Sequence, residues 1–172
     1  MNRRLITIAL TALALGACAE PEVRTVYVPT TVPAYQAPTE DVRRIQMVKK
    51  GSNTFLVNIA ISGVCCFPFL VDSGASDVSV SPDLFRAMVK GGHLTRADMI
   101  DVREYQTAAG GSVHGLRFRM PPMTIGNITI RGVVGSVTPG TSDAPLLLGQ
   151  SFLAAFKSWS IDNQTHELVL KP

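Results

Sequence analysis

From about residue 50 onward, short apolar or alternating runs are separated by turn residues, a pattern typical of β-strands. The first strands are predicted at 53–61 (NTFLVNIAI), 65–71 (CCFPFLV) and 77–81 (DVSVS), and Ser62-Gly63 predicts a turn between the first two. Pro68 favours an edge or irregular position for the second strand, because proline cannot donate a backbone hydrogen bond.

Helical signals interrupt this β pattern in three places. Ser81-Pro82-Asp83 has the features of a helix start, with Ser as N-cap, Pro at the first position and an acid in the first turn. That helix is expected to end at Gly91-Gly92. Thr95 followed by Asp98 predicts a second, short helical turn. Residues 150–156 (QSFLAAF) predict a short amphipathic helix.

The second half of the chain is predicted to be β again. The segments REYQTA and SVHGLRF flank Ala109-Gly110-Gly111, a plausible hairpin tip because glycines accept positive φ. MTIGNITIRGVVGSVTP predicts two or three more strands, and SWSIDNQTHELVL predicts a closing hairpin that turns near Asn163-Gln164. About eight to ten short strands with two or three short helices predict a small, mostly β, barrel-like domain.

The N-terminal segment has a different composition. Asn2-Arg3-Arg4 is followed by an apolar stretch too short to span a bilayer comfortably. Leu15-Gly16-Ala17-Cys18 resembles a bacterial lipoprotein signal, which is cleaved before a cysteine that becomes acylated. The alternative is an ordinary signal peptide cleaved around Ala17 or Ala19.

The segment that follows is predicted to be a tether. It contains four prolines and no glycine between residues 19 and 41, which favours extended chain. We therefore assign 1–17 to a signal peptide, 18–41 to a lipid-anchored tether and 42–172 to the folded domain. Ala19 is not the aspartate that favours inner-membrane retention in known lipoproteins, so we expect a periplasm-facing anchor in the outer membrane.

Composition narrows the classes of function. Among 172 residues, 46% are hydrophobic and 17% charged, which suits a folded core rather than global disorder. The formal charge of +3 includes Arg3 and Arg4, and leaving them out gives 14 basic against 13 acidic residues. No basic stripe is present elsewhere, so we expect no nucleic-acid partner.

The remaining cysteines and the histidines do not indicate a metal or cofactor. A disulfide between neighbours such as Cys65 and Cys66 is uncommon, so we favour two small buried apolar residues at the head of a strand. No second Cys/His pair at ligand spacing accompanies them. His93, His114 and His166 are far apart in the sequence and are expected at the surface.

The candidate chemistry lies in FLVDSGAS (69–76), where Asp72 directly follows an apolar run. Asp-Ser-Gly alone is a common turn sequence. Here the chain returns at once to a predicted strand, and a distant LLLGQSFL supplies an apolar pair, a glycine and a short helix. These are the parts needed for a strand to pass beneath an acid-bearing loop and pack against it.

Four segments then resemble, in order, the retropepsin-like aspartic proteases, specifically their bacterial single-domain branch. They are FLVDSGASDVSVSPDLF, YQTAAGGSV, MTIGNITIRGVVGSV and LLLGQSFLAAFKSWSIDNQTHELVL, and together they extend over about residues 45–170. The resemblance implies an all-β, retropepsin-like acid protease fold with one lobe per chain. It also implies that Asp72 is the catalytic aspartate, that Ser73 joins the two halves of the site, and that Gly74 lets the loop approach the carboxylates closely.

The same resemblance assigns two supporting elements. The hairpin at 105–112, with Ala109, Gly110 and Gly111 at its tip, is implied to be the flap that closes over the substrate. Leu147-Leu148-Gly149 is implied to support the catalytic loop.

Physical chemistry adds a requirement for a second carboxylate. Two carboxylates about 3 Å apart cannot both ionise, and aspartic proteolysis uses such a pair, sharing a proton, to activate one water. No other acid in the chain is followed by Ser or Thr and then Gly. We therefore expect a two-fold homodimer in which Asp72 faces its own copy and the polypeptide substrate lies as an extended strand beneath the flaps. We also expect an activity optimum at mildly acidic pH.

The leading hypothesis is an aspartic endopeptidase that acts on envelope or periplasmic proteins. The alternative is a non-catalytic envelope lipoprotein that uses the same fold for peptide binding or scaffolding. Asp77 either helps to hold the peptide or, as we favour, is an exposed acid at a strand edge. Tyr105 either covers substrate or packs across strands. Asp162 is expected in a turn, and Trp159 in the core or an interface.

Overall fold

The computed structural model describes residues 41–51, 54–107, 109–140 and 144–172. The strands within these ranges are β1 (Arg43–Gln46), β2 (Val48–Lys50), β3 (Thr54–Ile61), β4 (Val64–Val71), β5 (Val78–Val80), β6 (Met99–Gln106), β7 (Ser112–Arg119), β8 (Met123–Ile125), β9 (Ile128–Ile130), β10 (Val134–Val137), β11 (Leu147–Leu148), β12 (Ser158–Asp162) and β13 (Glu167–Lys171). The helices are α1 (Pro82–Lys90), the 3-10 turn η1 (Arg96–Asp98) and α2 (Gln150–Leu153).

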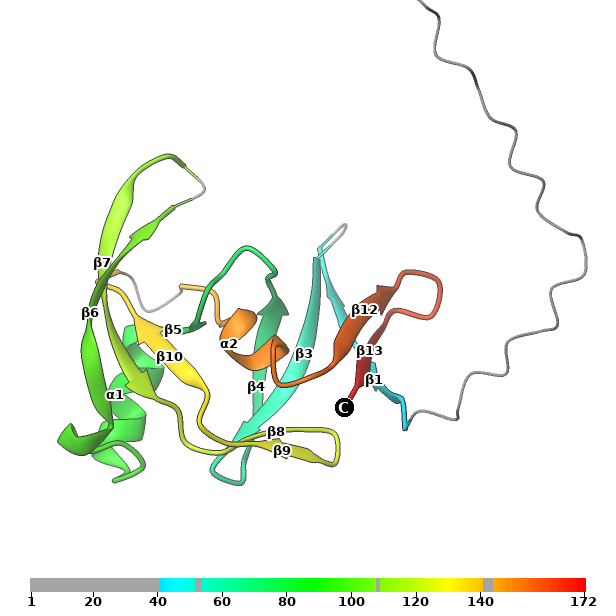
Figure 1. Ribbon diagram of the computed structural model, residues 1–172, viewed down its shortest axis with the longest axis horizontal. Helices are drawn as coiled ribbons and strands as arrows, with labels where there is room; N and C mark the ends of the chain where they lie inside the picture. The colour runs from blue at the N-terminus through cyan, green and yellow to red at the C-terminus, as the bar shows by residue number, and fades with distance from the viewer. Residues whose placement is uncertain (1–40, 52–53, 108, 141–143) are drawn as a thin grey trace, which may run out of the picture. The chain divides into compact units, whose positions relative to one another are not determined.

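Most of these strands form one large sheet in the order β6-β7-β10-β5-β11-β4-β3-β8-β9, with β2 paired to β3 (Figure 1). Its neighbours are antiparallel except for the pairs β10–β5 and β11–β4, which are parallel. Such mixed pairing requires long connections, because only antiparallel neighbours can be joined by a tight hairpin. The fold is the mostly β fold that the sequence predicted.

The order of the central strands explains why a loop forms after β4. Strand β11 lies between β4 and β5 although it is formed much later in the chain. Its Leu147 aligns with Leu70 of β4 on one side and with Ser79 of β5 on the other. The chain leaving β4 must therefore cross the end of β11 before it enters β5. Residues 72–77, which include Asp72, make this crossing.

A single apolar core fills the inner faces of these elements. Its fully buried large side chains come from β3, β4, β7, β8, β11, α2 and β13; the largest are Phe69, Phe118, Phe152, Ile59, Met123, Ile125, Leu148, Leu153, Leu168 and Leu170. Helix α1 adds to it through a contact between the rings of Phe85 and Phe118, whose centroids are 5.0 Å apart. Burying a side chain of this size contributes about 1.5–3 kcal/mol to stability.

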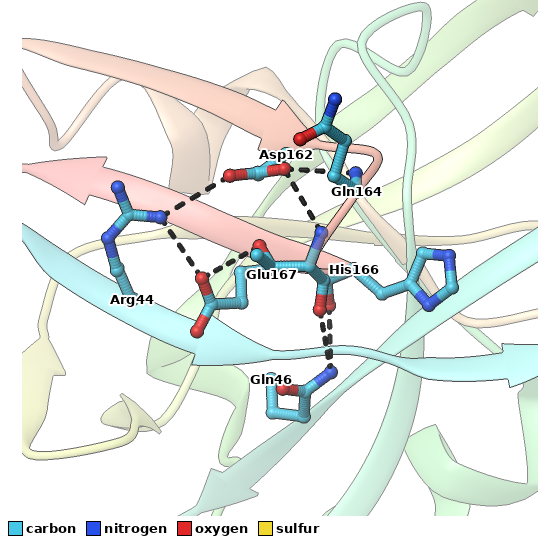
Figure 2. A network of polar contacts seen from close by, with 7 residues as sticks. Arg44, Gln46, Asp162, Gln164, His166 and Glu167 are labelled. Carbon is cyan, nitrogen blue, oxygen red and sulfur yellow. Dashed lines mark hydrogen bonds and ion pairs between the residues drawn. The ribbon is translucent and has the colours of Figure 1, made fainter.

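Strands β1, β13 and β12 form a second, three-stranded sheet in that order. Polar contacts on its outer surface join β1 to the β12–β13 hairpin (Figure 2). The guanidinium of Arg44 pairs with Glu167 at 3.0 Å and with Asp162 at 3.5 Å. The side-chain amide of Gln46 donates to the carbonyl oxygen of His166 at 3.1 Å. Because the Arg44 side chain is exposed, its ion pairs contribute at most about 1 kcal/mol.

Several local predictions are confirmed. The Oγ of Ser81 accepts a hydrogen bond from the N–H of Leu84 at the start of α1, which ends at Gly91 as expected. Thr95 and Asp98 form the predicted capping box. Asp162 is the predicted turn residue, since its Oδ1 accepts backbone hydrogen bonds from residues 164 and 165. Trp159 is half-buried and packs against the core.

Other predictions were wrong or only partly confirmed. Cys65 and Cys66 are exposed, because the head of β4 lies at the surface rather than in the core. The short helix predicted at 150–156 is present but ends earlier, because α2 spans Gln150–Leu153 and the chain turns at Ala154. The predicted edge or irregular position of Pro68 is confirmed locally, because Pro68 pairs with Asn58 of β3 on one side while β11 pairs only with the last two residues of β4 on the other.

The membrane-related predictions fall outside this structure. Cys18, the predicted signal peptide and all but the last residue of the predicted tether lie outside the described residues. Within the described ranges, no helix is long and apolar enough to cross a membrane.

Candidate active site

The loop that carries Asp72 is held from below by backbone hydrogen bonds. The N–H of Asp72 donates to the carbonyl of Leu148 at 3.2 Å, where β11 runs beneath the loop. Further along the chain, the N–H of Gln150 donates to the carbonyl of Ala75 at 2.8 Å and that of Ser151 to Ser76 at 3.0 Å. The start of α2 therefore fixes the second half of the loop, while β11 fixes its first residue.

Gly149 is required at the contact between the loop and α2. A Cβ built on Gly149 would overlap the carbonyl oxygen of Asp77 and lie 2.7 Å from that of Ala75. No side chain fits there without moving the backbone of the loop. The structure thus places Leu148 and Gly149 directly against the acid-bearing loop, and Leu147 lines the cleft beside it.

Two polar side chains at the start of α2 complete the support. The Nε2 of Gln150 donates to the carbonyl oxygen of Ser73 at 2.9 Å. The Oγ of Ser151 donates to the carbonyl of Val134 at 2.6 Å and accepts from the N–H of Val78 at 3.0 Å. The two side chains together bind backbone groups of the loop (Ser73), of β5 (Val78) and of β10 (Val134). Helix α2 therefore connects these three segments.

Asp72 itself is half-buried at the end of β4 and faces the cleft. Its Oδ1 accepts a hydrogen bond from the N–H of Gly74 at 2.8 Å, which fixes the orientation of the carboxylate. A Cβ on Gly74 would lie only 3.3 Å from that oxygen, so glycine allows this close approach. Ser73, between them, is exposed.

A cleft of about 760 Å³ opens above this loop. The loop itself forms its floor, residues 103–107 at the end of β6 and the start of the hairpin turn cover one side, and Ser136 and Thr138 of the β10 region line the rest. Most of the lining residues carry polar side chains, but apolar atoms make up the larger part of the lining surface. A volume of this size suits a peptide or another ligand of similar size.

The β6–β7 hairpin forms as predicted, and its tip projects past the other strands of the large sheet (Figure 1). Thr107 and Gly111 bind each other through both backbone and side chain at its tip, and Gly110 adopts a positive φ of 84°. Ala109, Gly110 and Gly111 are exposed and are absent from the lining of the cleft. Tyr105, in contrast, lines it.

The prediction that Asp77 is an exposed strand-edge acid was wrong. Asp77 is 7% exposed, and its Oδ2 accepts a hydrogen bond from the hydroxyl of Tyr105 at 2.6 Å. The pKa of Tyr105 is raised to about 12. Partial burial is the larger cause, and the hydrogen bond to Asp77 is the second. The loop that crosses β11 turns Asp77 inward, which the alternation of the DVSVS segment did not reveal.

This geometry agrees with a comparison of sequences. Residues 57–155 match the family described as gag-polyprotein putative aspartyl protease, a span that covers more than half of the chain. The chain belongs to this aspartyl protease family. The matched span begins within β3 and ends just after α2, so it includes the loop, the hairpin and the elements beneath the loop.

A solved structure shows the same fold as this aspartyl protease. It is described as the crystal structure of a retropepsin-like aspartic protease from Rickettsia conorii, with 24% sequence identity and a TM-score of 0.53. The similarity covers 78% of this chain and 94% of the other. A search of curated proteins found no match.

Three residues at the site have roles that their sequence pattern did not predict. Gln150 and Ser151 were assigned only to a short amphipathic helix, although two polar residues directly after Leu-Leu-Gly were an available signal. Asp77 was given the wrong environment. Within the described ranges, no group of three or more His, Cys, Asp or Glu side chains is arranged to hold a metal ion.

Proposed function

We propose that this chain is an aspartic endopeptidase whose active site forms when two copies bring their Asp72 carboxylates together. The position of Asp72 is the observation that carries the proposal. It lies at the floor of a peptide-sized cleft, on a loop whose backbone is fixed by β11 and α2. A turn residue of no chemical importance would not need this support.

The second carboxylate must come from outside the lobe described here. Besides Asp72, two acids line the cleft: Asp77, whose Oδ2 already accepts the Tyr105 hydroxyl, and Glu104, which lies on strand β6 and not on the loop that carries Asp72. Asp77 is also buried, so little of it is open to the cleft. A two-fold dimer supplies the missing carboxylate without any further acid, since one residue near the axis meets its own copy.

In the proposed reaction, the ionised carboxylate takes a proton from the water held between the pair. The water oxygen then bonds to the carbonyl carbon of the peptide, while the protonated carboxyl gives its proton to the carbonyl oxygen. The peptide C–N bond breaks as the nitrogen takes the proton that the first carboxyl accepted from water, and a hydroxyl of the tetrahedral intermediate returns one proton to the second carboxylate. Ser73, exposed beside Asp72, is proposed to join the two loops across the axis.

The location remains part of the proposal and rests on the N-terminal sequence. Acylation of Cys18 and the proline-containing segment after it would tether the protease to the outer membrane, where it faces periplasmic and envelope proteins. Two lipid-anchored copies would also meet more often than free ones, which favours the dimer.

Cleavage of a peptide library by the full chain in detergent tests the proposal. We expect wild type to cleave, Asp72→Asn to be inactive, and Asp83→Asn to behave as wild type. Asp83 is the matched control, because it is an exposed aspartate of α1 outside the cleft lining. If wild type and Asp72→Asn bind peptides equally and neither cleaves them, the chain is a peptide-binding module and the proposal fails.

A further inference from the structure

One hydrogen bond joins the projecting hairpin to the loop that carries Asp72. The hydroxyl of Tyr105, near the end of β6, donates to the Oδ2 of Asp77 at 2.6 Å. Both residues line the cleft, so the bond closes one end of the space between the hairpin and the loop. Its acceptor is a carboxylate, which makes it stronger than a bond between two neutral groups.

The Asp77 end of this bond cannot shift easily. The carbonyl of Asp77 lies against Gly149, with no room for even a methyl group between them. The next residue, Val78, donates its N–H to the Oγ of Ser151 and aligns with Gly135 of β10. The carboxylate of Asp77 is therefore a fixed point of the same framework that positions Asp72.

The Tyr105 end is also fixed, but by the hairpin itself. A Cβ built on Gly115 of β7 would lie 3.0 Å from the Cε2 of Tyr105 and 3.0 Å from the Cγ2 of Thr138. Glycine at position 115 therefore leaves the space into which the Tyr105 ring packs, across the strands of its own hairpin. With the ring held in this way, the direction of the hydroxyl follows the direction of the hairpin.

We propose that Tyr105 and Asp77 are positioning residues that hold the outer part of the hairpin, next to its turn, at a set height above Asp72. This inference rests on the proposed function, since the height matters only if a substrate is bound between hairpin and loop. The described residues of the hairpin tip, 106–107 and 109–112, extend beyond the bond and are exposed. The bond does not hold the residues beyond Tyr105, so Tyr105 acts as the pivot about which the tip closes over the substrate.

The proposal predicts how each group acts on the reaction. Without the Tyr105 hydroxyl, the hairpin also adopts conformations in which it lies too far from the loop to contact the substrate. Only a fraction of the molecules then has the conformation that binds, so the apparent affinity falls. KM should therefore rise more than kcat falls. A hydroxyl that merely stabilises the fold would have the opposite signature, because a loss of folded protein lowers kcat and leaves KM unchanged.

The test uses the full chain in detergent with Tyr105→Phe, Asp77→Asn and the double variant. Thr129→Val is the matched control, because it removes a side-chain hydrogen bond, to Thr124, from the separate β8–β9 hairpin. Amide hydrogen exchange of residues 106–113 is measured without substrate, and KM and kcat are measured with a cleaved peptide.

In Tyr105→Phe we expect exchange of these amides to rise about tenfold, the effect of losing one hydrogen bond to a charged group. KM should rise by a similar factor, and Asp77→Asn should add nothing further when combined with Tyr105→Phe. Thr129→Val should change neither quantity.

Unchanged exchange and KM in Tyr105→Phe would overturn the proposal, as would a fall in kcat alone. If wild type cleaves nothing, the proposed function fails, and the exchange measurement still decides whether the bond holds the hairpin.

Discussion

The side-chain amide of Gln150 donates a hydrogen bond to the backbone carbonyl of Ser73, 2.9 Å away. This bond connects the first residue of α2 to the residue that follows Asp72. Because the hydrogen bond comes from a side chain, it can be removed without altering the backbone bonds that hold the rest of the loop.

We predict that Gln150→Ala lowers activity more than stability. The Gln150 side chain is exposed, so its loss should reduce the free energy of unfolding by about 1 kcal/mol or less. The Ser73 carbonyl loses its partner, and kcat should fall about tenfold because small displacements of the catalytic loop are costly. Peptide cleavage and denaturant unfolding measure the two effects. Gln164→Ala, in the exposed β12–β13 turn, is the control, and an equal loss of kcat there would contradict the assignment.

Gly149→Ala should be strongly destabilising. Its Cβ would overlap the carbonyl oxygen of Asp77, so the loop or α2 must move, at a cost of about 3 kcal/mol or more in the free energy of unfolding. Thermal or denaturant unfolding measures this cost. Gly140→Ala is the matched control, because a Cβ there meets nothing within 4 Å. Similar stability of both variants would show that α2 and the loop are not packed as described.

Ser151→Ala removes a hydroxyl that satisfies two backbone groups at once. The N–H of Val78 and the carbonyl of Val134 both lose their partner, and the cost should be about 1–3 kcal/mol for each group that remains buried. We expect a clear drop in the denaturant midpoint. Ser160→Ala, at an exposed position of β12, should change it little. Equal midpoints for the two variants would contradict the bridging role of Ser151.

The raised pKa of Tyr105 predicts a loss of stability at alkaline pH. A phenol with an ordinary pKa of about 10 when unfolded and about 12 when folded favours the folded state while it is protonated. This contribution is fully present below pH 10 and is lost as the pH rises from about 10 through 12. The unfolding free energy of wild type should therefore fall more steeply across that window than that of Tyr105→Phe. Parallel curves would mean that the hydroxyl is not bonded to Asp77 in solution.

The sequence correctly predicted the caps and turns that depend only on neighbouring residues. The Ser81 cap, the Thr95–Asp98 capping box and the Asp162 turn each depend on residues within a few positions of one another, and each formed as expected. The apolar run that became β11 was also recognised as the partner of the Asp72 loop, because its residues resemble those of a known family.

Long-range geometry could not be obtained in this way. Asp77 continues a strand-like alternation, yet the crossing over β11 turns it into the cleft to meet Tyr105, a residue 28 positions away. Cys65 and Cys66 look like core residues because they precede an apolar strand, but the head of β4 is exposed. Such environments depend on which segments meet, and periodicity alone does not encode that information.

The central claim is that one active site needs Asp72 from two chains, and mixed dimers test it most directly. Wild type and Asp72→Asn chains carrying different tags are co-produced in equal amounts at a fixed total concentration, and cleavage is measured per total chain. If the two Asp72 carboxylates share one site, only dimers of two wild-type chains are active, and the rate should be about a quarter of that of wild type alone. A rate of about half would show that each chain works by itself and would contradict the shared site.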